Sequence, residues 1–183
     1  MKEEDHRKYA IAAFQGYENN RIKLIKSVAI SDLPDNKDIG PNNNQNVVYI
    51  LRLNPNRTIH ASVSAIPNRN DEKMILYIGG HNEGIGGNRY NQLISSCRQA
   101  EAFFDVKDYA DNDKRHKHSV AGCLTTALLQ TGFRIKDCII DLISDAEYNE
   151  LEFIIGYQEK YHHLPPWNSN RKGAQGYIPK FNV

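Results

Sequence analysis

The spacing of apolar residues changes partway along this chain, and that change limits the folds open to it. From Asn88 onward apolar residues recur at helical intervals, as at Leu93 and Cys97. Before that point the apolar segments are short, rich in β-branched residues and bounded by turn residues. These properties predict strands at 46–53, 58–66 and 73–80.

The remaining segments extend this pattern on both sides. A short helix is predicted at 4–18 and a strand within 21–30, followed by a Pro- and Asn-rich loop at 31–46. Further along we predict a helix at 119–131, a strand at 133–143 and a last helix that stops before "LPPWN". Ser144 and Glu147 form an S-x-x-E pattern that predicts the start of that helix. The predicted fold class is mixed α/β, with a small, largely antiparallel central sheet flanked by helices.

Composition narrows the class of protein. The chain has 183 residues, a net charge of +1 and 40% hydrophobic residues, which suits one globular domain. No apolar run approaches the ~20 residues that span a bilayer, and the charged N-terminus lacks a signal-peptide core. The odd, widely spaced cysteines Cys97, Cys123 and Cys138 predict buried thiols in a reducing compartment, so we expect a cytoplasmic protein without a membrane partner.

Four polar residues stand where the predicted elements begin or end. Tyr49 and Tyr77 lie on two of the strands, and Arg89 lies in the first turn of a helix, where backbone N–H groups favour an anion. Glu152 interrupts an apolar stretch of the last helix. Each also has an ordinary structural reading, since strand tyrosines usually pack in a core and helical charges are usually solvated. The glycine-rich loop at 79–87 matches neither a Walker loop nor a dinucleotide fingerprint.

Together these segments resemble one known family. "NVVYI" followed by "LYIGG" is similar to the paired motif of the GIY-YIG nucleases, and "NRYNQL" is similar to their arginine-bearing helix. "ELEFII" followed by "LPPWN" resembles their closing element, in the form found in restriction and phage endonucleases. The resemblance covers roughly residues 46–170 in the family's order.

The resemblance implies a role for each matching residue. Tyr49 would act as general base on a water, and Tyr77 would position that water or the scissile phosphate. Arg89 would neutralise the phosphate, and Glu152 would bind one Mg²⁺ (or Mn²⁺) per active site, with Asn168 supporting the site. Phosphodiester hydrolysis needs these functions, because a water must lose a proton while charge grows on the phosphate.

The basic segment "DKRHKHS" at 113–119 is the local candidate for a DNA-binding surface, because the overall charge is close to neutral. We expect Lys114, Arg115 and Lys117 to contact DNA, together with Asn168. The family often has His or Tyr four residues after the arginine, where this chain has Leu93. His118 or Lys117 would take that role.

The chain also departs from the family, which leaves alternatives open. The first motif reads Val47-Val48-Tyr49, without its glycine and isoleucine. If the strand at 58–66 is the partner of "MILYIG" instead, Val63 takes the place of the first tyrosine and His60 or a serine must compensate. Glu150 and Glu147 are rivals of Glu152 as the metal ligand.

These observations predict an N-terminal extension at 1–45 that contacts DNA or forms a dimer, and a GIY-YIG-like nuclease domain with an extra hairpin at 46–183. The expected protein is a divalent-metal-dependent endonuclease of restriction or phage type that hydrolyses double-stranded DNA as a homodimer. The alternative is a catalytically inactive module on the same fold that binds nucleic acid or protein.

Overall fold

A computed structural model describes residues 3–33, 47–55, 70–81, 92–95, 97–98, 134–144 and 148–168. The described residues form a four-stranded sheet in the order β1-β4-β2-β3, and every neighbouring pair is antiparallel. Its strands are β1 (Leu24–Ala29), β2 (Val47–Leu53), β3 (Ile75–His81) and β4 (Cys138–Ser144). The helices are α1 (Glu3–Glu18) and α4 (Glu150–Tyr161), with 3₁₀ turns η1 (Ile30–Asp32) and η3 (Ile135–Asp137). The predicted mixed α/β class with an antiparallel sheet is confirmed.

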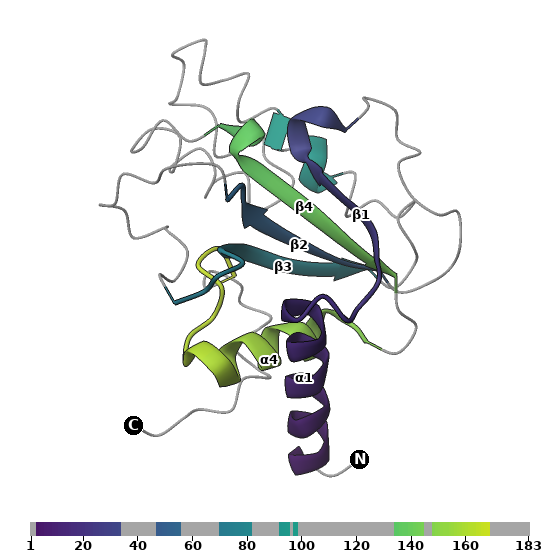
Figure 1. The fold of residues 1–183 in the computed structure, drawn as a ribbon, viewed down its shortest axis with the longest axis vertical. Helices are drawn as coiled ribbons and strands as arrows, with labels where there is room; N and C mark the ends of the chain where they lie inside the picture. The colour runs from purple at the N-terminus through teal and green to yellow at the C-terminus, as the bar shows by residue number, and fades with distance from the viewer. Residues whose placement is uncertain are drawn as a thin grey trace.

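The sheet has two covered faces, because successive side chains of a strand point to opposite sides. Val48 and Ile50 of β2 pack in a cluster with Phe153 and Tyr157 of α4. We call this side the helix face, and Figure 1 shows α1 and α4 lying together on it. The other side carries Tyr49 and the rest of a second buried cluster, and we call it the tyrosine face.

The two helices approach each other closely on the helix face. A Cβ atom at Gly156 of α4 would lie 2.4 Å from Cβ of Phe14 and 2.5 Å from the carbonyl oxygen of Ala10, both in α1. Glycine is therefore required at this crossing, where the backbones almost touch. Since β1 also pairs with β4, residues 3–33 belong to the same core as the rest of the sheet instead of standing apart as an extension.

The start of α4 differs from the prediction. Asn149 is the N-cap of the helix, and Glu152 completes a capping box with it. The sequence offers two such patterns, one beginning at Ser144 and one at Asn149. Ser144 is the last residue of β4 and pairs with Val47, so the first pattern is still in the sheet. The second pattern therefore caps the helix, and the prediction of Ser144 and Glu147 was wrong.

Some predicted elements lie outside the described residues, namely the strand at 58–66 and the helix at 119–131. Cys97 and Cys138 are buried in the cluster on the tyrosine face, as predicted, whereas Cys123 lies outside the described residues. Within the described ranges, no helix combines the length and apolar character needed to cross a membrane.

Candidate active site

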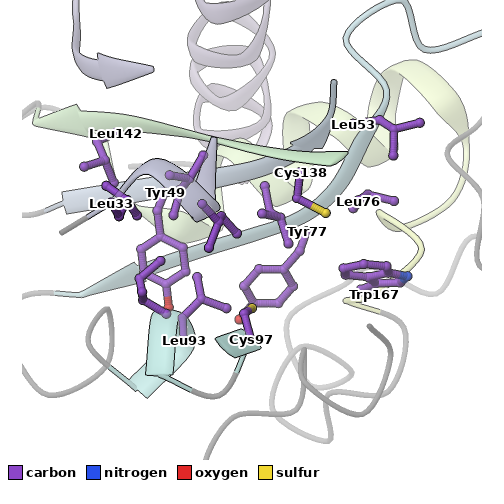
Figure 2. Packing of buried hydrophobic residues seen from close by; sticks show 14 of the residues in the cluster. Leu33, Tyr49, Leu53, Leu76, Tyr77, Leu93, Cys97, Cys138, Leu142 and Trp167 are labelled. Carbon is purple, nitrogen blue, oxygen red and sulfur yellow. The ribbon is translucent and has the colours of Figure 1, made fainter. Parts of the chain in front are cut away.

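Tyr49 and Tyr77 lie side by side on the tyrosine face. They come from the neighbouring strands β2 and β3, and their ring centroids are 6.2 Å apart with an angle of 32° between the planes. Both side chains are fully buried. Figure 2 shows the two rings pointing the same way, toward Leu93 and Cys97 of the helical segment on this side. The structure thus brings together the tyrosines of the two predicted motifs.

Gly79 makes this arrangement possible. It lies directly opposite Tyr49 in the antiparallel register. A Cβ atom at this position would be 2.3 Å from Cε2 of Tyr49 and 2.7 Å from Cε1 of Tyr77, well inside van der Waals contact. The glycine of "YIG" therefore leaves the space that both tyrosine rings occupy, and any larger residue must displace a ring.

The segment "PPWN" packs along the outer edge of β3. The backbone N–H of Trp167 donates to the carbonyl of Leu76 over 2.9 Å. The side-chain amide of Asn168 accepts from the N–H of Ile78 (2.8 Å) and donates to its carbonyl (2.7 Å). Asn168 is fully buried and satisfies one residue of an edge strand as a neighbouring strand would. The closing element is thereby fixed to the strand that carries Tyr77.

β2 is hydrogen-bonded to the inner edge of β3. The register runs from Val47, which lies opposite His81, to Arg52, which lies opposite Ile75. Tyr49 therefore lies on the strand that is paired with the strand carrying Tyr77. The rival candidates Val63 and His60 lie outside the described residues.

Glu152 lies on the other side of the sheet. Its Oε2 accepts from the backbone N–H of Asn149 (2.8 Å), and its Oε1 lies 3.0 Å from Nε2 of His6 in α1. The side chain is buried, with 6% of the residue exposed. The structure does not bring this carboxylate to the tyrosine face.

The start of α4 lies against the last residues of β3. A Cβ atom at Gly80 would lie 2.8 Å from Cβ of Glu150, and Gly80 follows Gly79, which lies opposite Tyr49. The first turn of α4 is therefore close to the strand positions next to Tyr49, but on the opposite face of the sheet. Glu150, the rival metal ligand, is the acidic residue in contact with this end of β3.

The resemblance implies that Glu152 binds Mg²⁺, and the fit of that ion depends on the groups around the carboxylate. Among the described residues there is no group of three or more histidine, cysteine or acidic side chains placed to hold a metal. Mg²⁺ keeps several waters, however, and is commonly bound by one or two carboxylates with phosphate oxygens completing the shell. Each Glu152 oxygen has one neighbouring donor and a second lone pair. Among the described residues, Glu152 would therefore supply at most one protein ligand to such an ion.

The other predicted site residues lie outside the described residues. They are Arg89, Glu147, His118 and the DNA-contact candidates Lys114, Arg115 and Lys117.

One buried polar cluster was not anticipated from the sequence. Asp141 of β4, which is 1% exposed, accepts hydrogen bonds from Tyr17 (2.7 Å), Ser27 (2.5 Å) and Arg52 (2.7 Å). These donors come from α1, β1 and β2, so one carboxylate joins four elements on the helix face. The sequence contains a single acid in "CIIDLIS" and a single base in "ILRL". Such isolated charges in apolar strands indicate a buried pair, because a charge in a buried strand needs a partner.

The cluster also changes how two of its members ionise. Burial raises the pKa of Tyr17 well above its usual value, and the neighbouring Asp141 carboxylate raises it further. Burial alone would lower the pKa of Arg52, but the hydrogen bond and charge of Asp141 outweigh it and raise that pKa. Tyr17 is therefore a neutral donor and Arg52 a permanent cation.

A cleft of about 700 Å³ opens between α1, α4 and the turn at 70–73. Its walls carry acidic and basic side chains in equal number, and several of these side chains have polar partners. Lys160 donates to Glu18, Lys73 donates to Asn20, and Glu159 pairs with Arg7. The cleft therefore favours no particular charge of ligand.

Comparison with known proteins adds no relative: the chain matches no family model, and neither curated proteins nor solved structures gave a match.

Proposed function

We propose that this chain is a divalent-metal-dependent DNA endonuclease of the GIY-YIG type, closest in character to restriction and phage enzymes. The observation that carries the proposal is the Tyr49–Tyr77 pair. Two motifs that resemble those of the family lie on hydrogen-bonded strands, and their tyrosine rings adjoin at Gly79, where even one added Cβ atom would displace a ring.

In this proposal the reaction is hydrolysis of a phosphodiester in double-stranded DNA. Tyr49 accepts a proton from the attacking water, directly or through Tyr77, and Tyr77 positions the water or the phosphate. A tyrosine has a pKa near 10 in water, so it needs a nearby cation to serve as a base near neutral pH. Arg89 supplies one such charge and stabilises the phosphate as its charge grows.

Glu152 is the proposed protein ligand of one Mg²⁺ or Mn²⁺, and the ion supplies positive charge at the phosphate oxygens. The first turn of α4 lies against Gly80, next to the glycine opposite Tyr49, which is the observation that favours this role. Asn168 supports the site by fixing the edge of β3. The basic residues Lys114, Arg115 and Lys117, with His118 beside them, would face the DNA. Two subunits would cut the two strands.

A second candidate function is a module of the same fold that binds nucleic acid or protein without catalysis. The observation that favours it is the position of Glu152, which caps α4 and pairs with His6 on the face opposite the tyrosines. If this arrangement persists when DNA binds, the carboxylate does not reach the phosphate that the tyrosines would contact.

The two candidates are separated by cleavage of supercoiled plasmid with Mg²⁺, with Mn²⁺ and with a chelator. We expect nicked and linear products that require the metal. Glu152→Gln removes a charge and little volume, so it should abolish cleavage while DNA binding in a gel-shift assay persists. Glu159→Gln is the matched control, because Glu159 lies in the same helix and pairs with Arg7. It should cut as the parent does.

Each other outcome has a distinct meaning. A parent protein that binds DNA but never cuts it supports the non-catalytic module. If Glu152→Gln cuts at the parental rate, Glu152 is not the metal ligand, and Glu150 is the next residue to replace.

A further inference from the structure

A helical segment on the tyrosine face lies over the Tyr49–Tyr77 pair. We call this segment the cover, and its described residues are 92–95 and 97–98. The cover is buried in one cluster with the two tyrosines, and it contributes to that cluster Leu93, Ile94 and Cys97. Figure 2 shows both rings pointing toward the cover. The cover therefore closes the side of the sheet on which the proposed chemistry would take place.

Both tyrosines are out of reach of a large ligand in this arrangement. Neither Tyr49 nor Tyr77 is exposed to solvent, and both hydroxyl oxygens are buried as well. A general base must come within about 2.6–3.2 Å of the group whose proton it takes, directly or through one water. A phosphate of duplex DNA cannot come that close to either hydroxyl while the rings are covered.

The strands that carry the tyrosines are held on both sides, since β2 is hydrogen-bonded to both β3 and β4. The cover, in contrast, contacts the described residues through its apolar side chains and through a hydrogen bond from Arg98 to the carbonyl of Leu33. We propose that the cover is a lid that must shift away from Tyr49 and Tyr77 before DNA can reach their hydroxyls. This inference rests on the proposed function and adds a step that controls access to the same site.

The competing explanation is that the cover is ordinary core, which opens only when the whole chain unfolds. Two cysteines distinguish these possibilities. Cys97 lies on the cover and Cys138 lies on β4, and both are fully buried in the same cluster. If the cover opens by itself, a thiol reagent reaches Cys97 while Cys138 stays protected. If only the whole chain unfolds, the two thiols react together.

The first experiment is modification of the native full chain by N-ethylmaleimide, with each cysteine followed separately by peptide mass spectrometry. A minor open state typically holds about 0.1–10% of the molecules, so we expect Cys97 to react at least about tenfold faster than Cys138. Leu93→Ala removes apolar contacts that close the cover and should raise the rate at Cys97 by about tenfold or more. Leu142→Ala is the matched control, because Leu142 is equally buried in the same cluster but lies on β4. It should not raise the rate at Cys97 relative to that at Cys138.

The second experiment measures kcat/KM for plasmid cleavage with the same variants. A protein whose competent state is a minor one acts with an efficiency reduced by the populated fraction. Leu93→Ala should therefore raise kcat/KM by a factor similar to the increase in the rate at Cys97, whereas Leu142→Ala should not. If the alanine variants fold poorly, Ile94→Val on the cover and Ile140→Val on β4 form a milder matched pair within the same cluster.

Equal rates at Cys97 and Cys138 in the parent would overturn the inference, because the cover would then not open by itself. It would also be overturned if Leu93→Ala exposed Cys97 without raising kcat/KM. In either case, a parent that cuts DNA and a Tyr49→Phe variant that does not would leave the proposed function intact. A parent that never cuts DNA would overturn the proposed function, and the role of the cover would fail with it.

Discussion

The two faces of the sheet are built in different ways. On the helix face, buried carboxylates are matched by donors from distant segments, since Asp141 bonds to Tyr17 and Glu152 bonds to His6. On the tyrosine face, two rings on adjacent strands lie together, and Gly79 leaves the space that they occupy. Both faces carry an apolar cluster, and the helix face adds buried carboxylates that are bonded to donors from distant parts of the chain.

This difference gives the tyrosines of the two faces different roles. The helix-face tyrosine Tyr17 contributes to stability, and the tyrosine-face pair is assigned to the proposed chemistry. The Asp141 cluster uses its tyrosine hydroxyl to join α1 to the sheet, so removing that hydroxyl acts on folding. The rings of Tyr49 and Tyr77 fill the core by their apolar surface, which phenylalanine retains. Tyrosine-to-phenylalanine substitutions on the two faces should therefore have opposite effects. On the helix face we expect a loss of stability without loss of cleavage, and on the tyrosine face a loss of cleavage with little loss of stability.

The largest expected effect is on cleavage. Tyr49→Phe should lower turnover about 10²–10⁴-fold because the proton acceptor is lost, and Tyr77→Phe should do the same or slightly less. Both variants should melt within a few degrees of the parent. Single-turnover cleavage of plasmid DNA at saturating protein measures the first quantity, and a thermal melt measures the second. Full activity in Tyr49→Phe would remove it from the site and direct attention to His60 or the basic segment at 113–119.

Asp141→Asn should cause the largest loss of stability on the helix face. Asp141 is almost completely buried and is the carboxylate partner of Arg52, so the substitution leaves a partly buried cation without its counter-charge. Breaking such a pair costs about 3–5 kcal/mol, and we expect the lower end because 17% of the Arg52 side chain is exposed. Urea unfolding measures the change. Asp32→Asn, at an exposed carboxylate, is the control, and a similar loss in both variants would contradict the argument.

Asn168→Ala should cost less, about 2–3 kcal/mol. It leaves the N–H and the carbonyl of Ile78 without the partners that they have at the edge of β3, and each unsatisfied buried group costs about 1–3 kcal/mol. Asn149→Ala removes an exposed helix cap and should cost only about 1 kcal/mol. Equal losses in the two variants would mean that water replaces Asn168 at the edge strand.

The strands could be predicted because their signals are local. Val47–Leu53 and Ile75–His81 are short, rich in β-branched residues and bounded by turn residues. The position of Tyr49 next to Tyr77 was expected from the resemblance, and the two tyrosines lie on paired strands. The start of α4 was missed because two capping patterns lie five residues apart and only tertiary structure selects one.

The partners of the buried charges could not be predicted, because they depend on contacts between segments that are 89 to 146 positions apart. Nothing near Glu152 in the sequence indicates that a histidine of the first helical turn will contact it. A buried strand aspartate signals that some donor is needed, but the sequence does not identify Tyr17 as that donor. Sequence patterns thus predicted the strands that carry Tyr49 and Tyr77, whereas the partners of the buried charges on the helix face could be found only in the structure.

The smallest expected effect comes from Tyr17→Phe, which removes one hydrogen bond to Asp141 and should cost about 1 kcal/mol at neutral pH, without loss of cleavage.

The difference in stability between the parent and Tyr17→Phe depends on pH. The folded-state pKa of Tyr17 is raised above the ordinary value near 10, mainly by burial and then by Asp141. The unfolded parent therefore loses a proton above pH 10 that the folded parent keeps, and each further pH unit removes up to about 1.4 kcal/mol of its stability. Tyr17→Phe lacks this contribution, so the advantage of the parent should shrink between pH 8 and pH 11. Urea unfolding of both proteins across that range measures it, and a constant difference would show that Tyr17 ionises in the folded protein as it does in water.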